Sequence, residues 1–196
     1  MARCFLAFEL TERSRQALQG WFEPFLQGLK AENSRVLHPV PAANWHTTLL
    51  FFSDLSEESM GRAWEQMRTW SGEKAWGALE FNWKGLALWP SERRPGLICL
   101  EAQVYSAHPP WPILNHLKQP PFNAGQGDHL RTYRPHITLA RIRGRGSRSL
   151  VQDLKKALAH HAATPLPAIQ LDRLSFFLSA KAPGNPIYPR AYTLEL

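Results

Sequence analysis

The sequence has few cysteines and no long apolar run. Its two cysteines, Cys4 and Cys99, lie in apolar, strand-like stretches, so we expect reduced core residues rather than a disulfide framework. Nowhere do eighteen apolar residues run together, and the short apolar run at the N-terminus is interrupted by Glu9. The pattern predicts neither a membrane span nor a signal peptide. We therefore expect a cytoplasmic protein that does not associate with membranes.

Several enzyme classes are disfavoured because their motifs are missing. The sequence has no Gly-x-Ser-x-Gly elbow of a serine hydrolase and no Gly-x-x-x-x-Gly-Lys loop for a nucleoside triphosphate, which disfavours ATP-dependent ligation. A metal hydrolase needs at least three protein ligands. The only adjacent histidine pair, His160-His161, falls on a predicted helix, where neighbouring side chains diverge. We expect neither a metal nor another cofactor.

The sequence does contain a short pattern that occurs twice. His46-Thr47-Thr48-Leu49 is repeated as His136-Ile137-Thr138-Leu139. Composition alone predicts roughly 0.05 copies of His-x-Thr-Leu in a chain of this length, so two copies are not a chance match. Neither copy has a Cys, His or carboxylate nearby at the spacing of metal ligands. The repeat therefore indicates a paired-histidine site that works without a metal.

Both copies fall in predicted β-strands, over residues 45–52 and 135–141. Side chains alternate between the two faces of a strand. His136 and Thr138 therefore share one face, while Ile137 and Leu139 share the other and can pack in a core. His46 and Thr48 likewise share a face. In each copy the imidazole and the hydroxyl are expected to point the same way.

A pair of histidines suits displacement at phosphorus. One neutral imidazole can take a proton from the attacking water, and one imidazolium can give a proton to the leaving oxygen, because histidine titrates near neutral pH. The hydroxyls of Thr48 and Thr138 can donate hydrogen bonds to phosphoryl oxygens. A single strand histidine is usually structural, but the duplication favours the catalytic interpretation.

The chain resembles the RNA 2′,3′-cyclic phosphodiesterase family, also called 2′-5′ RNA ligases, in the two-histidine (2H) phosphoesterase superfamily. Beyond the two motifs, the similarity lies in the opening strand at residues 3–10, the approach to the first motif at 40–46, the second-motif segment at 131–141 and a late strand at 174–179. It spans most of the chain and is weak between about residues 56 and 130.

The resemblance implies an α+β fold with one bilobal catalytic domain over residues 1–196. Two antiparallel sheets with outer helices would meet at a central groove, lined by one His-x-Thr strand from each lobe. The implied substrate is RNA ending in a 2′,3′-cyclic phosphate, which water opens to a 2′-phosphate; joining such an end to a 5′-hydroxyl would form a 2′-5′ linkage. By similarity, His46 is the general acid and His136 the general base.

Three further residues are candidates for substrate binding. Phe51 and Arg141 each lie five residues after a motif histidine, and in the family these positions resemble a base-stacking aromatic and a phosphate-contacting arginine. Strict alternation would place both on the face opposite the histidines, which would bury the charge of Arg141 at a cost. A β-bulge or an early strand end would resolve this conflict. Arg134 shares the parity of His136 and is a weaker candidate.

Charge also favours a polyanionic partner. The formal net charge is +7, and six arginines gather around the second motif: Arg131, Arg134, Arg141, Arg143, Arg145 and Arg148. This distribution favours a polyanionic substrate, although basic surface residues are often merely solvated. Two alternatives stay open: a related phosphodiesterase acting on small cyclic nucleotides or RNA 3′ ends, and an RNA-binding module without catalysis. We expect a monomer.

The remaining periodicity predicts outer helices and further strands. We expect helices from Thr11 to Glu23, ended by Pro24, and from Ser56, as N-cap, to Trp70. Further helices are expected over residues 113–118 and 149–158, and strands over 79–88, 96–104, 169–179 and 190–196.

Overall fold

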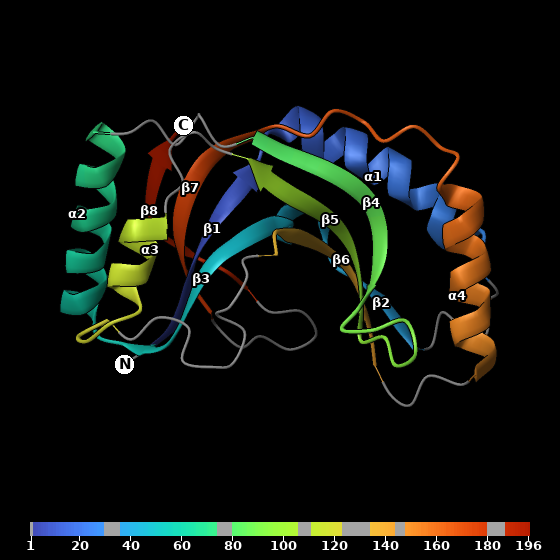
Figure 1. Ribbon diagram of the computed structural model, residues 1–196, viewed down its shortest axis with the longest axis horizontal. Coiled ribbons are helices and arrows are strands. Elements are labelled where there is room, and N and C mark those ends of the chain that lie inside the picture. The colour runs from blue at the N-terminus through green and yellow to red at the C-terminus, as the bar shows by residue number, and fades with distance from the viewer. Residues whose placement is uncertain are drawn as a thin grey trace.

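In the described parts of the chain, eight strands form one antiparallel sheet, and the helices gather in two pairs toward its ends (Figure 1). The computed structural model describes residues 2–29, 36–73, 80–105, 111–122, 134–143, 148–179 and 187–196. The strands are β1 (Ala2–Leu10), β2 (Leu37–Pro39), β3 (His46–Leu55), β4 (Glu80–Trp89), β5 (Leu97–Tyr105), β6 (His136–Ile142), β7 (Leu171–Leu178) and β8 (Arg190–Glu195). The helices are α1 (Glu12–Gln27), α2 (Glu57–Glu73), α3 (Trp111–Leu117) and α4 (Arg148–His161), with a 3-10 turn at Ala42–Asn44.

The sheet consists of two halves that meet between the two motif strands. Its order is β4-β5-β6-β3-β1-β7-β8, with β2 also paired to β6. Between β3 and β6 the only register pair is Thr47 with Ile137. The expected two sheets are therefore joined into one through a narrow contact, because the adjoining residues 140–142 of β6 pair with β2 instead. The α+β fold class is confirmed.

Each half of the sheet has its own hydrophobic core. One core contains Leu6 and Phe8 of β1, Phe176 of β7 and residues of α2 and α3, such as Met67 and Leu117. The other core contains residues of β5, β6, α1 and α4, among them Ile98, Ile137, Phe22 and Leu154. Figure 1 shows the same division, with α2 and α3 at one end of the sheet and α1 and α4 at the other. The helices at each end of the sheet thus pack on a different core.

The first helix does not end at Pro24, as the sequence suggested. It continues to Gln27 with Pro24 inside it. A proline in a helix lacks one N–H donor and crowds the preceding turn. Phe25 is 3% exposed and packs in the core that α1 and α4 share with β5 and β6. The amide of Gly28 still donates to the Pro24 carbonyl at 3.0 Å. Burial of Phe25 therefore offsets the local cost of the proline.

The other predicted elements are present with small shifts in their ends. Ser56 caps α2, since its Oγ accepts from the Ser59 amide at 3.1 Å. The predicted helix at 113–118 begins earlier, at Trp111, and the one at 149–158 extends to His161. Strand β2 was not predicted; it is three residues long and shows no periodicity.

Two chemical predictions about the core and the membrane can be compared with the structure. Cys4 and Cys99 are free and buried, as expected, and burial raises the pKa of their thiols to about 11 and about 12. None of the helices in the described ranges is both long and apolar enough to cross a bilayer.

Candidate functional site

The four motif side chains lie together where β3 meets β6. Thr47 and Ile137 are register partners and are both 0% exposed. In an antiparallel pair, the positions one step away on either side are also opposite one another. His46 therefore lies opposite Thr138, and Thr48 opposite His136. These four residues are partly buried and share one face of the sheet, which we call the histidine face.

Each motif histidine is oriented by the backbone two residues before it. Nδ1 of His46 lies 2.8 Å from the carbonyl oxygen of Asn44, and Nδ1 of His136 lies 3.0 Å from that of Arg134. A carbonyl oxygen can only accept, so Nδ1 carries the proton and donates in both residues. Nε2 is then the atom that can exchange a proton with a substrate, and the two imidazoles are prepared in the same way.

Aromatic rings enclose His46. Its ring centroid lies 4.8 Å from that of Phe5, 5.5 Å from Tyr188 and 6.0 Å from Phe177. This burial lowers the pKa of His46 to about 4; the charges of His136 and Arg141 act in the same direction, while the Asn44 carbonyl and Glu9 oppose it. In the free protein at neutral pH the His46 imidazole is therefore uncharged.

His136 packs against a single aromatic ring. The indole of Trp89, at the end of β4, lies 4.3 Å from the imidazole between centroids. Burial again lowers the pKa of His136, and Arg134 adds to this effect. The Arg134 carbonyl and the Glu101 carboxylate act in the opposite direction.

A bulge in each motif strand brings Phe51 and Arg141 to the histidine face. Two consecutive residues of β1 pair with Thr48 and Leu50 of β3, so Leu49 is the extra residue of a bulge. Two consecutive residues of β5 likewise pair with Thr138 and Ala140 of β6, so Leu139 is the extra residue there. Each bulge reverses the later alternation. The conflict noted in the sequence is resolved by a bulge in both strands.

The surroundings of these two residues agree with their new orientation. Phe51 is 57% exposed and its ring lies 5.6 Å from that of Phe5. Arg141 is partly buried, and its charge acts on His46. Its register partner on β2 is His38, which therefore shares the histidine face. Nothing in the sequence singled out His38.

Arg134 already has partners within the protein. Its Nη2 donates to Oε1 of Glu101 at 2.6 Å, and its guanidinium lies 4.4 Å from the centre of the Trp89 ring. Its role in substrate binding stays a prediction. Of the other arginines near the second motif, Arg143 is exposed. Arg131 and Arg145 lie outside the described residues, as does the side chain of Arg148.

Two hollows lie beside candidate binding residues. One, of 130 Å³, lies beside Phe51 and includes Arg3, Ser53 and Ser179 in its lining. The other, of 660 Å³, runs from Trp89 and Arg134 to α4. Phe51 and Arg134 each line one of these two hollows, whereas Arg141 lines neither.

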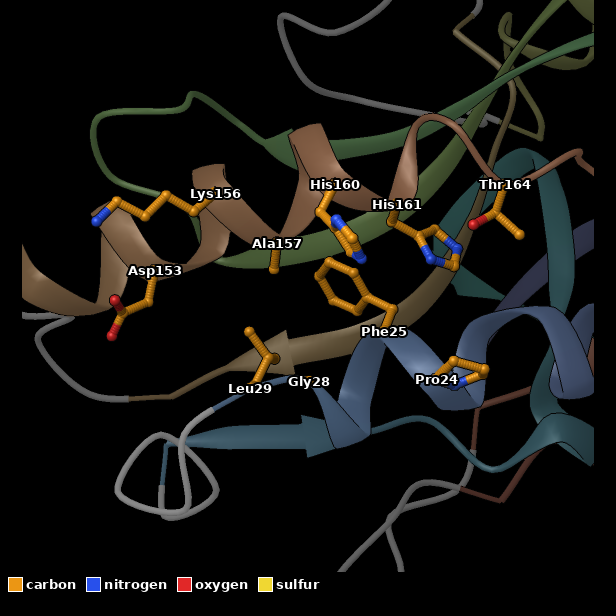
Figure 2. A pocket seen from close by; sticks show the side chains of 10 residues that line it. All are labelled: Pro24, Phe25, Gly28, Leu29, Asp153, Lys156, Ala157, His160, His161 and Thr164. Carbon is orange, nitrogen blue, oxygen red and sulfur yellow. The ribbon is translucent and has the colours of Figure 1, made fainter.

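A separate pocket of 400 Å³ lies between α1 and α4, and its lining includes no residue of β3 or β6 (Figure 2). Figure 2 shows His160 and His161 of α4 on one wall and Phe25 of α1 on the other. His161 is 6% exposed and packs edge-on against Trp21, 4.4 Å between centroids. In the part of the chain that the structure describes, no three His, Cys, Asp or Glu residues are grouped so as to hold a metal ion. The pocket thus offers no metal site among these residues.

Sequence reasoning missed the residues that surround the two histidines. Phe5, Trp89, Tyr188, Glu9 and Glu101 all lie on other strands or loops. They contact or face the histidines only because of the strand register. The one available signal was the resemblance of the opening strand, which contains Phe5 and Glu9.

One segment of the chain matches a known family, and the fold of the chain is similar to those of solved structures. A family model described as LigT like Phosphoesterase matches residues 118–188, which include the second motif. No curated protein matches the chain. The fold is similar to that of the protein TT0787 of Thermus thermophilus, at 19% identity, a TM-score of 0.63 and coverage of 99% of this chain and 97% of that one. It is also similar to E. coli LigT crystallised with 3′-AMP, at 20% identity, a TM-score of 0.60 and coverage of 100% and 98%. A structure of E. coli LigT with NADP+ matches at 19% identity, a TM-score of 0.59 and coverage of 100% and 98%.

Proposed function

Because the chain matches the LigT-like two-histidine phosphoesterases in its family segment and fold, we propose that it hydrolyses the 2′,3′-cyclic phosphate at an RNA end. The product would be a 2′-phosphate. The observation that carries this proposal is the meeting of both His-x-Thr motifs across β3 and β6, with both Nδ1 atoms committed to backbone carbonyls. Two equivalent imidazoles on one face suit general acid–base displacement at phosphorus.

In this mechanism His136 Nε2 takes a proton from water as the water oxygen attacks phosphorus. The bond from phosphorus to the 3′ oxygen breaks, and His46 Nε2 donates a proton to that oxygen. Thr48 and Thr138 donate hydrogen bonds to the non-bridging oxygens, where negative charge accumulates. The same steps with a 5′-hydroxyl in place of water would form a 2′-5′ linkage. The assignment of acid and base follows the family resemblance.

The role of His46 as acid requires a change in its protonation on binding. Burial holds the pKa of His46 near 4 in the free protein, so it must gain a proton with the substrate. The negative charge of the cyclic phosphate next to the imidazole raises the pKa in the complex, because an opposite charge favours the protonated form.

The proposed substrate is RNA rather than a small cyclic nucleotide. Phe51 presents an exposed ring on which a base can stack, and Arg141 provides a cation on the histidine face. The formal net charge of +7 also favours a polyanion. The E. coli LigT structures contain the nucleotides 3′-AMP and NADP+, which supports a nucleotide substrate here.

The proposal is tested by incubating the purified protein with a short RNA ending in a 2′,3′-cyclic phosphate, with excess chelator and no ATP. A 2′-phosphate product supports the proposal. A 3′-phosphate would keep the enzyme class but reverse the orientation of the substrate between His46 and His136. Hydrolysis of small cyclic nucleotides alone would change the substrate class, and RNA binding without product would indicate a binding module. Loss of activity in chelator would overturn the metal-free mechanism.

Alanine variants test the two histidines directly. His46→Ala and His136→Ala should each lower turnover by at least ~10²-fold, as is usual when a general acid or base is lost. His160→Ala is the matched control, because His160 is exposed on α4. Circular dichroism checks that the variants fold. Turnover near the wild-type rate in either motif variant would refute paired acid–base catalysis.

A further inference from the structure

Each motif histidine faces a glutamate on the neighbouring strand. Glu101 of β5 is the register partner of His136, and Glu9 of β1 is the register partner of His46. Directly opposed residues of an antiparallel pair share a face, with Cβ atoms about 4.5–5.5 Å apart. The internal repeat therefore includes a carboxylate beside each imidazole, which the His-x-Thr pattern does not show.

Each glutamate is held by an arginine and by a second donor. Oε1 of Glu101 accepts from Arg134 Nη2 at 2.6 Å and from Trp89 Nε1 at 2.9 Å. Glu9 accepts from Arg190 through both of its oxygens and from Ser175 Oγ. Glu9 is almost fully buried, whereas the Glu101 side chain is 29% exposed.

Beside His136 these contacts form one closed cluster. The Trp89 ring packs against the imidazole at 4.3 Å and under the Arg134 guanidinium at 4.4 Å. The same indole donates to Glu101, and the Arg134 carbonyl accepts from His136 Nδ1. Each member therefore contacts at least two others, so the ring of His136 is restrained from its face and from Nδ1.

We propose that Trp89, Glu101 and the Arg134 side chain are positioning residues for His136, which hold its ring in place and balance its charge. Trp89 fixes the ring plane. Glu101 favours the imidazolium, and the guanidinium of Arg134 opposes it. This inference rests on the proposed function for its consequence in catalysis, but the effect on the imidazole itself is independent of any substrate.

The charges that face His136 predict in which direction each substitution shifts the pKa of its imidazole. They are Glu101 on β5, Arg134 just before β6 and His46 on β3. Loss of the Glu101 carboxylate should lower the pKa of His136, whereas loss of the Arg134 cation should raise it. Opposite shifts would not result from general loosening of the fold.

The test is an NMR titration of the histidine ring protons in Glu101→Gln and Arg134→Gln. Glutamine at 101 keeps an acceptor for Trp89, and substitution at 134 keeps the carbonyl that fixes Nδ1. The pKa of His136 should fall by about 0.5–1 unit in Glu101→Gln and rise by a similar amount in Arg134→Gln. Glu65→Gln, in an exposed ion pair with Arg68 on α2, is the matched control and should cause no shift.

The same titration can also contradict the positioning role. No shift of His136 in either variant, or shifts of the same sign in both, would overturn the proposal. Trp89→Phe keeps the ring contact but removes the indole donor, and should broaden or displace the His136 signal with little change at His46. Equal changes at both histidines would also contradict a local role.

Kinetics then separate this proposal from the proposed function. With the cyclic-phosphate RNA, Glu101→Gln should lower kcat by up to about tenfold, because the imidazolium that forms as His136 takes its proton from water loses the stabilising charge of Glu101, an effect of about one pKa unit. KM should stay within about twofold. An inactive wild-type protein would refute the proposed function, while the NMR shifts would still decide the positioning role. A higher KM at unchanged kcat would show that Glu101 contributes to binding and would overturn its role as a positioning residue.

Discussion

Two adjacent threonines have opposite roles at the residue scale. Thr47 is 0% exposed, and its hydroxyl has no hydrogen-bond partner within the described residues. Thr48 is partly buried and lies on the histidine face beside His136. The bulge comes only after Thr48. The ordinary alternation of a strand therefore holds for Thr47 and Thr48, and their side chains point to opposite faces of β3.

Valine substitutions should separate these roles. Thr47→Val should raise the free energy of unfolding by about 1 kcal/mol and keep activity, because it removes a buried unsatisfied hydroxyl without changing shape. Thr48→Val should lower turnover by up to about 10²-fold, because it removes one donor to the phosphoryl oxygens. Urea unfolding and steady-state rates measure both. Loss of turnover in Thr47→Val alone would mean that the faces are assigned wrongly.

The value of kcat/KM should be highest on the acid side of neutral pH. Burial lowers the pKa of both His46 and His136. In the free protein both imidazoles therefore lose their extra proton at a pH below the ordinary value of about 6.5, and no imidazolium is left to act as the acid. A bell-shaped profile of kcat/KM is expected, with a decline as pH rises above about 6.5. Rates measured from pH 4 to 9 test this, and a maximum near pH 8 would contradict it.

At the scale of elements, the packing of α1 on α4 contains a pH-sensitive residue. His161 is buried, and its Nε2 has no hydrogen-bond partner in the described ranges. Burial, with a smaller effect of His160, lowers its pKa in the folded state. The unfolded chain therefore binds more protons below about pH 6.5, and stability must fall as pH falls through this range.

Replacement of His161 should remove this part of the acid sensitivity. In His161→Leu, the loss of unfolding free energy between pH 7 and pH 5 should be smaller than in the wild type. Urea unfolding at both values is the measurement. His116→Gln, which changes an exposed histidine on α3, is the control and should keep the wild-type dependence. The same loss in all three proteins would exclude His161 as the source.

The whole molecule has an excess of positive charge, which should make RNA binding dependent on salt. Each phosphate contact to a single strand contributes about 0.7 to the slope of log affinity against log salt. Arg141→Gln should raise KM for the RNA about tenfold and reduce this slope by about 0.7. Arg68→Gln removes the same charge from α2, where Arg68 is paired with Glu65, and should change neither quantity. Equal effects of the two variants would indicate net charge alone.

The local features of this protein could be predicted from its residues alone. The period of the apolar residues indicated α2, α4 and most strands, because the side chains that face a core recur at the helical or strand period. The duplicated motif identified His46, Thr48, His136 and Thr138 as a set, since spacing of two residues on a strand fixes a common face. Pro24 misled the prediction, because a local rule cannot include the burial of Phe25.

The meeting of residues from distant segments became known only from the folded chain. The register of β5 against β6 places Glu101 beside His136, and the end of β4 brings Trp89 onto the same imidazole. The bulges at Leu49 and Leu139 turned Phe51 and Arg141 to the histidine face. These outcomes depend on packing between strands far apart in the chain, for which the sequence carries no periodic signal, and a shift of register by one residue would reverse every one of them.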